Sequence, residues 1–360
     1  MTGGPRVLVL QQGAPGGIGR IELLVWRALQ AGASEVRVVS RRRPPDGFTA
    51  DPKGPRARLL VVANPVGYML RSLWQTIVAR PDVVLYTHVN TARLQLAVRL
   101  LRPRARTVLY VHGREVWERL SWLQRFALRS SGRLVLHTRF VGETLDAQGS
   151  AHAPMIVVHP SLSDDWAADV APRSAPTGDA VVLTVSRLEH GERQKGVDRV
   201  IEAFPAVLER VPGATLRIVG DGTDRERLER LATSLGLKRQ VRFLGAVDDA
   251  TVKRLYASSD VFALPSVQEG FGLVYAEAMA HGLPCVVAAG TAAREVVDVG
   301  VTGLAVEPDS VEELADAIGA LLTDRDQWCR MSRAAADRFQ RCFREAVYGQ
   351  AIRCVLLEAG

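Results

Sequence analysis

Two glutamates and a glycine turn form the densest group of chemistry-bearing residues in the chain. Glu269 and Glu277 stand eight positions apart in "SVQEGFGLVYAEAMAHGLPCVV" (266–287), and "GFG" follows the first of them. Glycines permit a tight turn, and the helix formers from Leu273 onward predict a helix whose positive N-terminus points at that turn. Such a turn can bind a diphosphate, while the carboxylates can accept hydrogen bonds from sugar hydroxyls.

Two basic residues provide the opposite charge. In "VSRLEHGERQKG" (185–196), Arg187 follows an expected strand and Lys195 ends a short loop before an expected helix. The planar fork of arginine and the point charge of lysine both suit diphosphate oxygens. Any one arginine in this arginine-rich chain is equally explained as a solvated surface residue, but the chain has only 4 lysines. We expect both residues to lie at the same sheet edge as the glutamates.

Four segments resemble the retaining glycosyltransferases of family 4, which have the two-domain GT-B fold. They are "RQKGVDRVIEAF", "LRIVGDG", "VRFLGAV" and "PSVQEGFGLVYAEAMAHGLPCVV". The resemblance is strong across residues 180–325 and weaker through the first half. It implies that Glu269 contacts the transferred sugar, that Glu277 contacts the ribose, and that Arg187 and Lys195 neutralise the diphosphate leaving group. An "HGE" insertion separates the basic pair further than in many members.

The resemblance extends to the base-binding edge and to the first half of the chain. The loop after "FLG", around Val247, resembles that edge. "YVHGREVWERL" (110–120) resembles the family's H-G-x-E-x-W stretch, in which the histidine, here His112, reaches the donor sugar. A histidine after a strand is otherwise often a structural group. His88 is a further candidate for acceptor contact, and no role is assigned to His137 or His159. The remaining donor-binding residues implied are Gly270, Phe271, Gly272 and Leu273.

The opening loop "QQGAPGGIGR" (11–20) raises a different possibility. Its G-x-x-x-G-x-G spacing is that of a nicotinamide-dinucleotide turn, and "RRR" (41–43) could meet a 2′-phosphate. Short-chain reductases with this spacing also need a Y-x-x-x-K pair, and the chain contains none. We therefore expect Gly16 and Gly17 to approach the donor diphosphate or the acceptor. A non-catalytic sugar-nucleotide-binding protein is the second alternative, disfavoured by the intact set of charged residues. A nucleic-acid binder is the third.

The elements that position these residues alternate between short apolar strands and amphipathic helices, which predicts an α/β protein with two doubly wound, Rossmann-like domains facing each other across a cleft. The domains are expected at 1–165 on the acceptor side and 179–340 for the nucleotide sugar, with a linker at 166–178. A last amphipathic stretch, 327–357, is expected to finish the second domain, and residues 341–360 to pack back on the first.

Composition limits the partners. With 47% hydrophobic and 24% charged residues, the chain has the profile of a globular protein. It shows no secretory signal or spanning segment, and its four cysteines show no metal or disulfide pattern, so we expect a cytoplasmic location. Residues 1–175 hold 24 Lys/Arg against 12 Asp/Glu. This basic half, with "LQRFALRSSGR" (123–133), suits peripheral contact with an anionic membrane at its inner face, although an arginine-rich composition explains the charge equally well.

The sequence thus predicts transfer of a hexose from a nucleoside diphosphate sugar to an acceptor hydroxyl with retention of configuration. We expect a UDP-, GDP- or ADP-sugar as the donor, and no metal or other cofactor. The acceptor is expected to be a glycan or lipid-linked molecule in cell-envelope polysaccharide or glycolipid synthesis, and a soluble natural product is the alternative. Because no carboxylate is clearly placed as a nucleophile, the resemblance favours a front-face route over a covalent glycosyl-enzyme.

Overall fold

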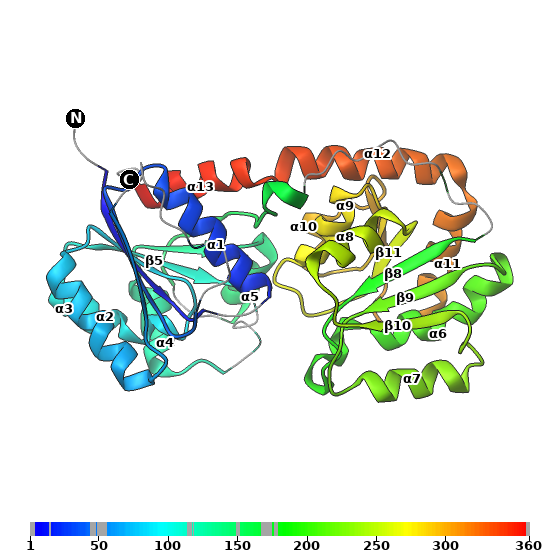
Figure 1. The fold of residues 1–360 in the computed structure, drawn as a ribbon, viewed down its shortest axis with the longest axis horizontal. Helices are drawn as coiled ribbons and strands as arrows, with labels where there is room; N and C mark the ends of the chain where they lie inside the picture. The colour runs from blue at the N-terminus through cyan, green and yellow to red at the C-terminus, as the bar shows by residue number, and fades with distance from the viewer. Residues whose placement is uncertain are drawn as a thin grey trace. The chain divides into compact units, whose positions relative to one another are not determined.

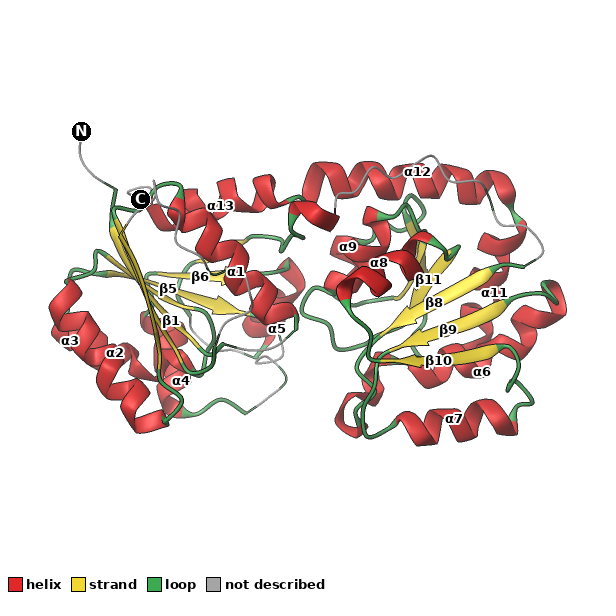
Figure 2. Cartoon of the chain, viewed as in Figure 1, coloured by secondary structure: helices red, strands yellow, loops and turns green. Residues whose placement is uncertain are grey.

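The computed structural model describes residues 4–13, 16–43, 48, 56–113, 117, 119–148, 152–166, 175 and 179–357 (Figures 1 and 2). The chain divides into two compact units, Met1–Ser161 with Glu345–Gly360, and Leu162–Arg344. Sequence analysis placed these boundaries near residues 165 and 341. Of the expected linker, residues 166–178, only Trp166 and Ala175 lie within the described residues.

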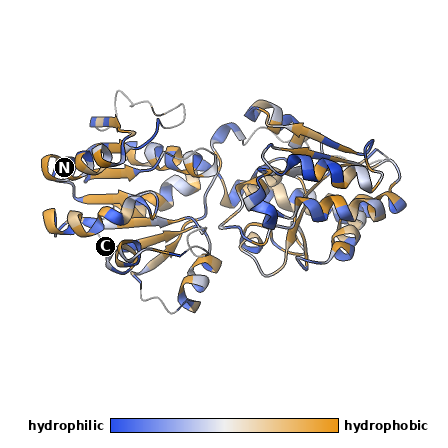
Figure 3. Cartoon of the chain, turned by 90° about the horizontal axis from the view of Figure 1, so that it is seen from below, coloured by the Kyte–Doolittle hydropathy of each residue, from blue (hydrophilic) through white to orange (hydrophobic). Residues whose placement is uncertain are grey.

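The first unit is built on a seven-stranded parallel sheet in the order β3-β2-β1-β4-β5-β6-β7. Its central strands are almost wholly buried because helices cover both faces, which explains their continuous apolar sequences. Figure 3 shows the strands mostly in the colour of apolar residues. The strands are β1 (Arg6–Gln11), β2 (Glu35–Ser40), β3 (Arg56–Val61), β4 (Val83–Tyr86), β5 (Arg106–Val111), β6 (Arg133–Leu136) and β7 (Met155–Val157).

Two helix layers cover this sheet. Helices α1 and α13 pack on one another and share a core with one face of the sheet (Figure 1). The other helices contribute to a separate core on the opposite face. The helices are α1 (Gly17–Gln30), α2 (Pro65–Ala79), the 3-10 turn η1 (Thr91–Leu94), α3 (Gln95–Leu101), α4 (Trp122–Ser130), α5 (Arg139–Ala147) and α13 (Glu345–Leu357).

The second unit contains a six-stranded parallel sheet in the order β10-β9-β8-β11-β12-β13. Helix α6 packs on α7 and α11, whereas α9 packs on α12, and one core joins them to the sheet. The strands are β8 (Val181–Val185), β9 (Thr215–Val219), β10 (Val241–Gly245), β11 (Val261–Leu264), β12 (Cys285–Ala288) and β13 (Gly303–Val306). The helices are η3 (Asp164–Trp166), η4 (His190–Lys195), α6 (Val197–Arg210), α7 (Arg225–Ser234), α8 (Asp249–Ala257), α9 (Leu273–Ala280), α10 (Ala293–Val296), α11 (Val311–Thr323) and α12 (Arg325–Cys342).

These two Rossmann-like sheets confirm the predicted fold class. The last amphipathic stretch, 327–357, forms two helices, α12 in the second unit and α13 in the first, and the division lies close to the boundary expected at residue 341. The break follows from tertiary contacts. The ring of Phe343 is buried against Phe271, and the Phe343 carbonyl accepts a hydrogen bond from the N–H of Leu162 at 3.0 Å.

No described helix combines the length and the apolar character needed to cross a lipid bilayer.

Helix α13 completes the core of the first unit, and its burial gives a testable prediction. Ile352 is fully buried in that core, whereas Val347 on the same helix is exposed. Ile352→Ala is expected to lower the free energy of unfolding of the first unit by about 2–4 kcal/mol, because it leaves a cavity. The control Val347→Ala should change it by less than about 0.5 kcal/mol. Urea titration of both variants checks this, and equal effects would contradict the assignment of α13 to that core.

Candidate active site

An ion pair joins two loops at the carboxyl edge of the second sheet. Strands β8 and β11 are adjacent and parallel, so the loops that follow them emerge side by side. Nζ of Lys195, from the first loop, donates to Oε1 of Glu269, from the second. Both side chains are largely shielded, with 20% of Lys195 and 12% of Glu269 exposed. The structure therefore brings together the lysine and the glutamate that the sequence predicted for one ligand.

Backbone contacts lock the same two loops. The N–H of Val267 donates to the carbonyl of Gln194 at 2.9 Å. Gly196, at φ +73°, lies so close to β11 that a Cβ there would sit 2.8 Å from the carbonyl oxygen of Pro265. Only glycine fits this position, so the end of the lysine loop is fixed against the glutamate loop.

Helix α9 begins at a glycine beside this pair. Gly272 is the N-cap at φ +86°, and it has no side chain to accept hydrogen bonds from the first helical turn. A Cβ at Gly272 would sit 2.4 Å from the ring of Tyr275. Phe271 is buried in the core against Phe343, so its ring anchors the turn and only its backbone is left for a ligand. Leu273, the first helical residue, packs partly on the same core. The helix N-terminus thus presents backbone N–H groups next to Gly270 and Glu269.

Glu277 lies within α9 and is almost completely buried. Its Oε2 accepts a hydrogen bond from the hydroxyl of Tyr256 at 3.0 Å, and the Tyr256 ring stacks on His281. A buried carboxylate is stable only when it is hydrogen-bonded, so Tyr256 is a partner that sequence analysis missed.

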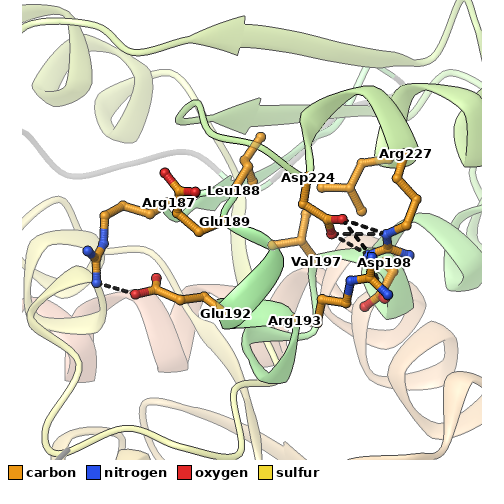
Figure 4. Close-up of a pocket in the computed structure, with 10 residues that line it drawn as sticks. Arg187, Leu188, Glu189, Glu192, Arg193, Val197, Asp198, Asp224 and Arg227 are labelled. Atoms are coloured by element: carbon orange, nitrogen blue, oxygen red, sulfur yellow. Dashed lines mark hydrogen bonds and ion pairs between the residues drawn. The ribbon is translucent and has the colours of Figure 1, made fainter.

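Arg187 points away from the sheet and is 70% exposed (Figure 4). Its guanidinium pairs with Glu192, whose side chain is nearly buried. Glu192 comes from the same inserted "HGE" segment, which forms η4. The insertion therefore supplies a carboxylate that competes for the arginine, a role that sequence analysis missed. Arg187 is paired with Glu192, not with Glu269.

A small pocket adjoins Arg187, and a second ion-pair network shapes its far side (Figure 4). Asp224 accepts hydrogen bonds from Arg227 and Arg193, and the Arg227 bonds are the main cause that lowers the pKa of Asp224. Arg193 belongs to η4 and Arg227 to α7, so this carboxylate ties the lysine loop to the loop after β9.

The loop after β9 reaches the same edge through Gly220. At φ +129°, a Cβ on Gly220 would lie 1.8 Å from the carbonyl oxygen of Ser186, directly before Arg187. The N–H of Gly220 donates to the Gly245 carbonyl at 2.9 Å, which links the loop to the end of β10. Val247 follows β10 and is half-buried against the core. Its base-binding role stays a prediction.

The first unit places four histidines at the carboxyl ends of four neighbouring strands. His88 follows β4, His112 follows β5, His137 follows β6 and His159 follows β7. Nδ1 of His112 lies 2.7 Å from Nε2 of His137, and Nδ1 of His159 lies 2.8 Å from the His137 carbonyl oxygen. The rings of His88 and His112 are 5.8 Å apart.

The hydrogen bonds of His112 fix its tautomer. Its Nε2 lies 2.6 Å from the carbonyl oxygen of Thr87, which can only accept, so this nitrogen carries the proton. Burial lowers the pKa of His112 to about 4, so the ring is neutral at pH 7 and Nδ1 accepts from Nε2–H of His137. Both ring nitrogens are thus used within the protein. A hydrogen bond between His112 and a sugar hydroxyl therefore requires the bond to Thr87 or the bond to His137 to break.

Thr87 extends this network to α1. Its hydroxyl donates to Oε1 of the buried Glu22 at 2.7 Å, while its carbonyl holds His112. Nδ1 of His88 accepts from the N–H of Asn90 at 3.0 Å. The Glu22–Thr87–His112–His137 chain was missed by sequence analysis, because its members lie far apart in the sequence. The only available signal was the histidine after each successive strand.

The structure shows a close packing contact at only one of the opening glycines it describes between Gly13 and Gly17. Gly16 is the N-cap of α1 at φ +73°, but a Cβ there would meet nothing within 4 Å, and Gly17 is exposed. The crowded position is Gly13, where a Cβ would lie 2.7 Å from the Arg42 carbonyl oxygen. The proposed approach of a ligand to Gly16 and Gly17 stays a prediction. In the described part of the chain, no three His, Cys, Asp or Glu side chains are grouped to hold a metal ion.

Comparison with family models matches both halves of the chain. Residues 168–338 match "Glycosyl transferases group 1" and residues 15–166 match "Glycosyltransferase Family 4".

Curated relatives agree. A GDP-mannose-dependent alpha-(1-6)-phosphatidylinositol monomannoside mannosyltransferase of Mycolicibacterium smegmatis is 31% identical over 303 residues, covering 76% of this chain and 78% of the relative. An uncharacterized glycosyltransferase of Methanocaldococcus jannaschii is 40% identical, but over only 41% of this chain and 36% of that relative. Among solved structures, Anabaena HepE in complex with UDP superimposes with a TM-score of 0.80 at 20% identity, covering 97% of this chain and 99% of that one.

The close approach at Gly220 predicts a large effect of a single methyl group. Gly220→Ala is expected to lower the free energy of unfolding of the second unit by about 3 kcal/mol or more, because the Cβ would collide with the Ser186 carbonyl. Gly236→Ala is the matched control: Gly236 also has positive φ, at +73°, but nothing lies within 4 Å of its Cβ. Gly236→Ala should lower the free energy of unfolding by about 1 kcal/mol. If urea titrations show similar losses for the two variants, the close packing of the loop after β9 on the loop after β8 is contradicted.

The neutral state of His112 predicts loss of stability in acid. Because its pKa is about 4 in the folded chain and about 6.5 when unfolded, the unfolded state binds more protons between these values. The contribution of neutral His112 to the free energy of unfolding is complete above about pH 6.5, and at pH 5 it is smaller by about 2 kcal/mol. Urea titrations at about pH 8 and about pH 5 measure this, and His112→Gln should reduce the difference. An unchanged difference in the variant would show that His112 is not the responsible group.

Proposed function

The chain belongs to family 4 of the glycosyltransferases, and from this membership we propose that it transfers a hexose from a nucleoside diphosphate sugar to an acceptor hydroxyl with retention of anomeric configuration. The observation that carries the proposal is the Lys195–Glu269 pair beside the N-terminus of α9. The pair places a cation, a carboxylate and helix N–H groups at one sheet edge, which is what a sugar diphosphate requires.

We assign the donor to the second unit. In the proposed reaction the bond between the sugar C1 and the diphosphate lengthens, and negative charge builds on the leaving phosphate. Lys195 and the N–H groups at Gly272–Leu273 stabilise that charge, and Arg187 joins them when it leaves Glu192. Glu269 accepts hydrogen bonds from the sugar hydroxyls once Lys195 turns to the phosphate. This charge is supplied by the chain's own groups, so we propose a metal-independent reaction.

We propose a front-face route. The departing phosphate oxygen takes the proton of the acceptor hydroxyl while the oxygen of that hydroxyl forms its bond to the sugar C1. Glu269 is ion-paired with Lys195, which supports a binding role rather than a nucleophilic one. A covalent sugar trapped on Glu269 would overturn this route. Product analysis by NMR tests retention, since an inverted anomer is incompatible with it.

We propose a lipid-linked or glycan acceptor in cell-envelope synthesis, used at the inner face of a membrane, with the first unit on the acceptor side. The support is the M. smegmatis relative, a GDP-mannose-dependent mannosyltransferase of phosphatidylinositol monomannoside. GDP-mannose is therefore the first donor to test. Relatives named for D-inositol 3-phosphate make a soluble anionic acceptor the second candidate.

Nucleotide binding and turnover test the proposal together. UDP, GDP and ADP are screened for a rise in melting temperature, and stabilisation by one of them is expected because a ligand of the folded state raises stability by mass action. Lys195→Ala should abolish that rise and lower turnover by about 10²–10³-fold, the usual effect of removing one group that stabilises developing charge. Lys253→Ala is the control, because Lys253 instead pairs with Asp165. If no nucleotide stabilises the chain, or if Lys195→Ala retains full turnover, the proposed donor site is refuted.

A further inference from the structure

Helix α2 of the first unit is amphipathic in the reverse sense. The side chains it buries are mostly polar, and they are Tyr68, Ser72, Gln75, Thr76 and Ala79. The side chains it exposes are large and apolar, and they are Val66, Met69, Leu70, Trp74, Ile77 and Val78. A surface helix of a globular domain normally does the opposite. Leu70 is 60% exposed and Trp74 56%, so the outward face is open to solvent.

Specific contacts hold the polar face inward. Helix α2 packs on β1 and β2. The side-chain oxygen of Gln75 accepts a hydrogen bond from Arg37 of β2 at 2.8 Å. The Thr76 hydroxyl donates to the carbonyl of Ser72 one turn earlier, at 2.9 Å. The bond between Gln75 and Arg37 therefore ties the polar side of α2 to β2, and the apolar side faces outward.

The exposed apolar surface continues onto neighbouring elements. Strand β3 is at the edge of the sheet and exposes Leu59 and Val61. Helix α3 packs beside α2, as Figure 1 shows, and exposes Leu96, Leu100 and Leu101. We call the exposed apolar residues of α2 and α3 the α2–α3 face. Contiguous apolar surfaces of this kind mark binding sites.

The charge around the α2–α3 face has one sign. Residues 56–113 contain nine arginines and a single acidic residue, Asp82. Asp82 pairs with Arg6 at 3.2 Å, outside this segment. Helices α2, α3 and α4 contain no Asp or Glu at all. Arg71 and Arg80, within α2 and at its end, are exposed.

We infer that the α2–α3 face docks the enzyme on an anionic phospholipid bilayer. Apolar side chains of such a helix enter the acyl boundary while flanking arginines bind lipid phosphates, and both terms add to the affinity. A second copy of the chain fits less well, because a symmetric contact would bring the two arginine-rich faces together without a carboxylate between them. The link to a lipid-linked acceptor rests on the proposed function, whereas the docking itself does not.

Vesicle binding tests the docking surface with the full chain. Sedimentation is measured with vesicles of phosphatidylcholine alone and with about one third phosphatidylglycerol. The wild-type chain should bind only the anionic vesicles and should be released by salt. Leu70→Gln/Trp74→Gln should weaken binding by more than about tenfold, because it removes the apolar side chains that insert. The control Leu235→Gln/Val301→Gln changes exposed apolar residues of the second unit and should bind like the wild type.

Three results would overturn the inference. They are absence of binding to anionic vesicles, equal binding to neutral ones, and undiminished binding by Leu70→Gln/Trp74→Gln. A wild-type dimer in light scattering that this variant converts to a monomer would also overturn it and assign the face to a second copy. Nucleotide-induced stabilisation is measured in the same samples. If the chain binds vesicles but no nucleotide stabilises it, the docking surface is supported and only the donor site is refuted.

Discussion

The Lys195–Glu269 ion pair is the contact on which the geometry of the second unit's site depends. It joins the loops after two adjacent strands, and nearby glycines allow the loops to approach each other closely. Gly196 lets the lysine loop meet β11, while Gly220 and the Asp224 ion pairs bring in the loop after β9. In the proposed reaction, a diphosphate that binds Lys195 releases Glu269 for the sugar, and the pair would then couple phosphate binding to sugar binding within one unit.

The two units solve the problem of polar groups at a sheet edge differently. The second unit pairs opposite charges, Lys195 with Glu269 and Arg187 with Glu192. The first unit instead joins His112 and His137 by a hydrogen bond, and burial lowers the pKa of both rings and so favours their neutral forms. Charged pairs therefore lie at the proposed leaving-group site, and a neutral, hydrogen-bonded histidine pair lies at the edge of the first sheet.

Local patterns predicted the fold and part of the site. A helix was expected directly after Lys195, and α6 begins at Val197. The placement of Lys195 and Glu269 at one sheet edge was also expected, because parallel strands end at the same edge, whereas their direct ion pair was not. A boundary near residue 341 was expected, but the core contact between Phe343 and Phe271 at the break between α12 and α13 was not. The partners of Glu277 and His112 were missed because they lie on other elements of the fold. Glu192 is only five residues from Arg187, and it was missed because the pairing depends on the conformation of η4.

Helix α13 makes the first unit discontinuous in the chain. On the ribosome, residues 4–161 emerge before residues 162–344, yet one helix of their core arrives only afterwards. Until then, the apolar residues of α1 that pack on Ile352 and Leu356, as well as Tyr110, which hydrogen-bonds Tyr348, remain uncovered. Completion of the first core therefore requires a contact between segments that are separated in the chain by the whole second unit.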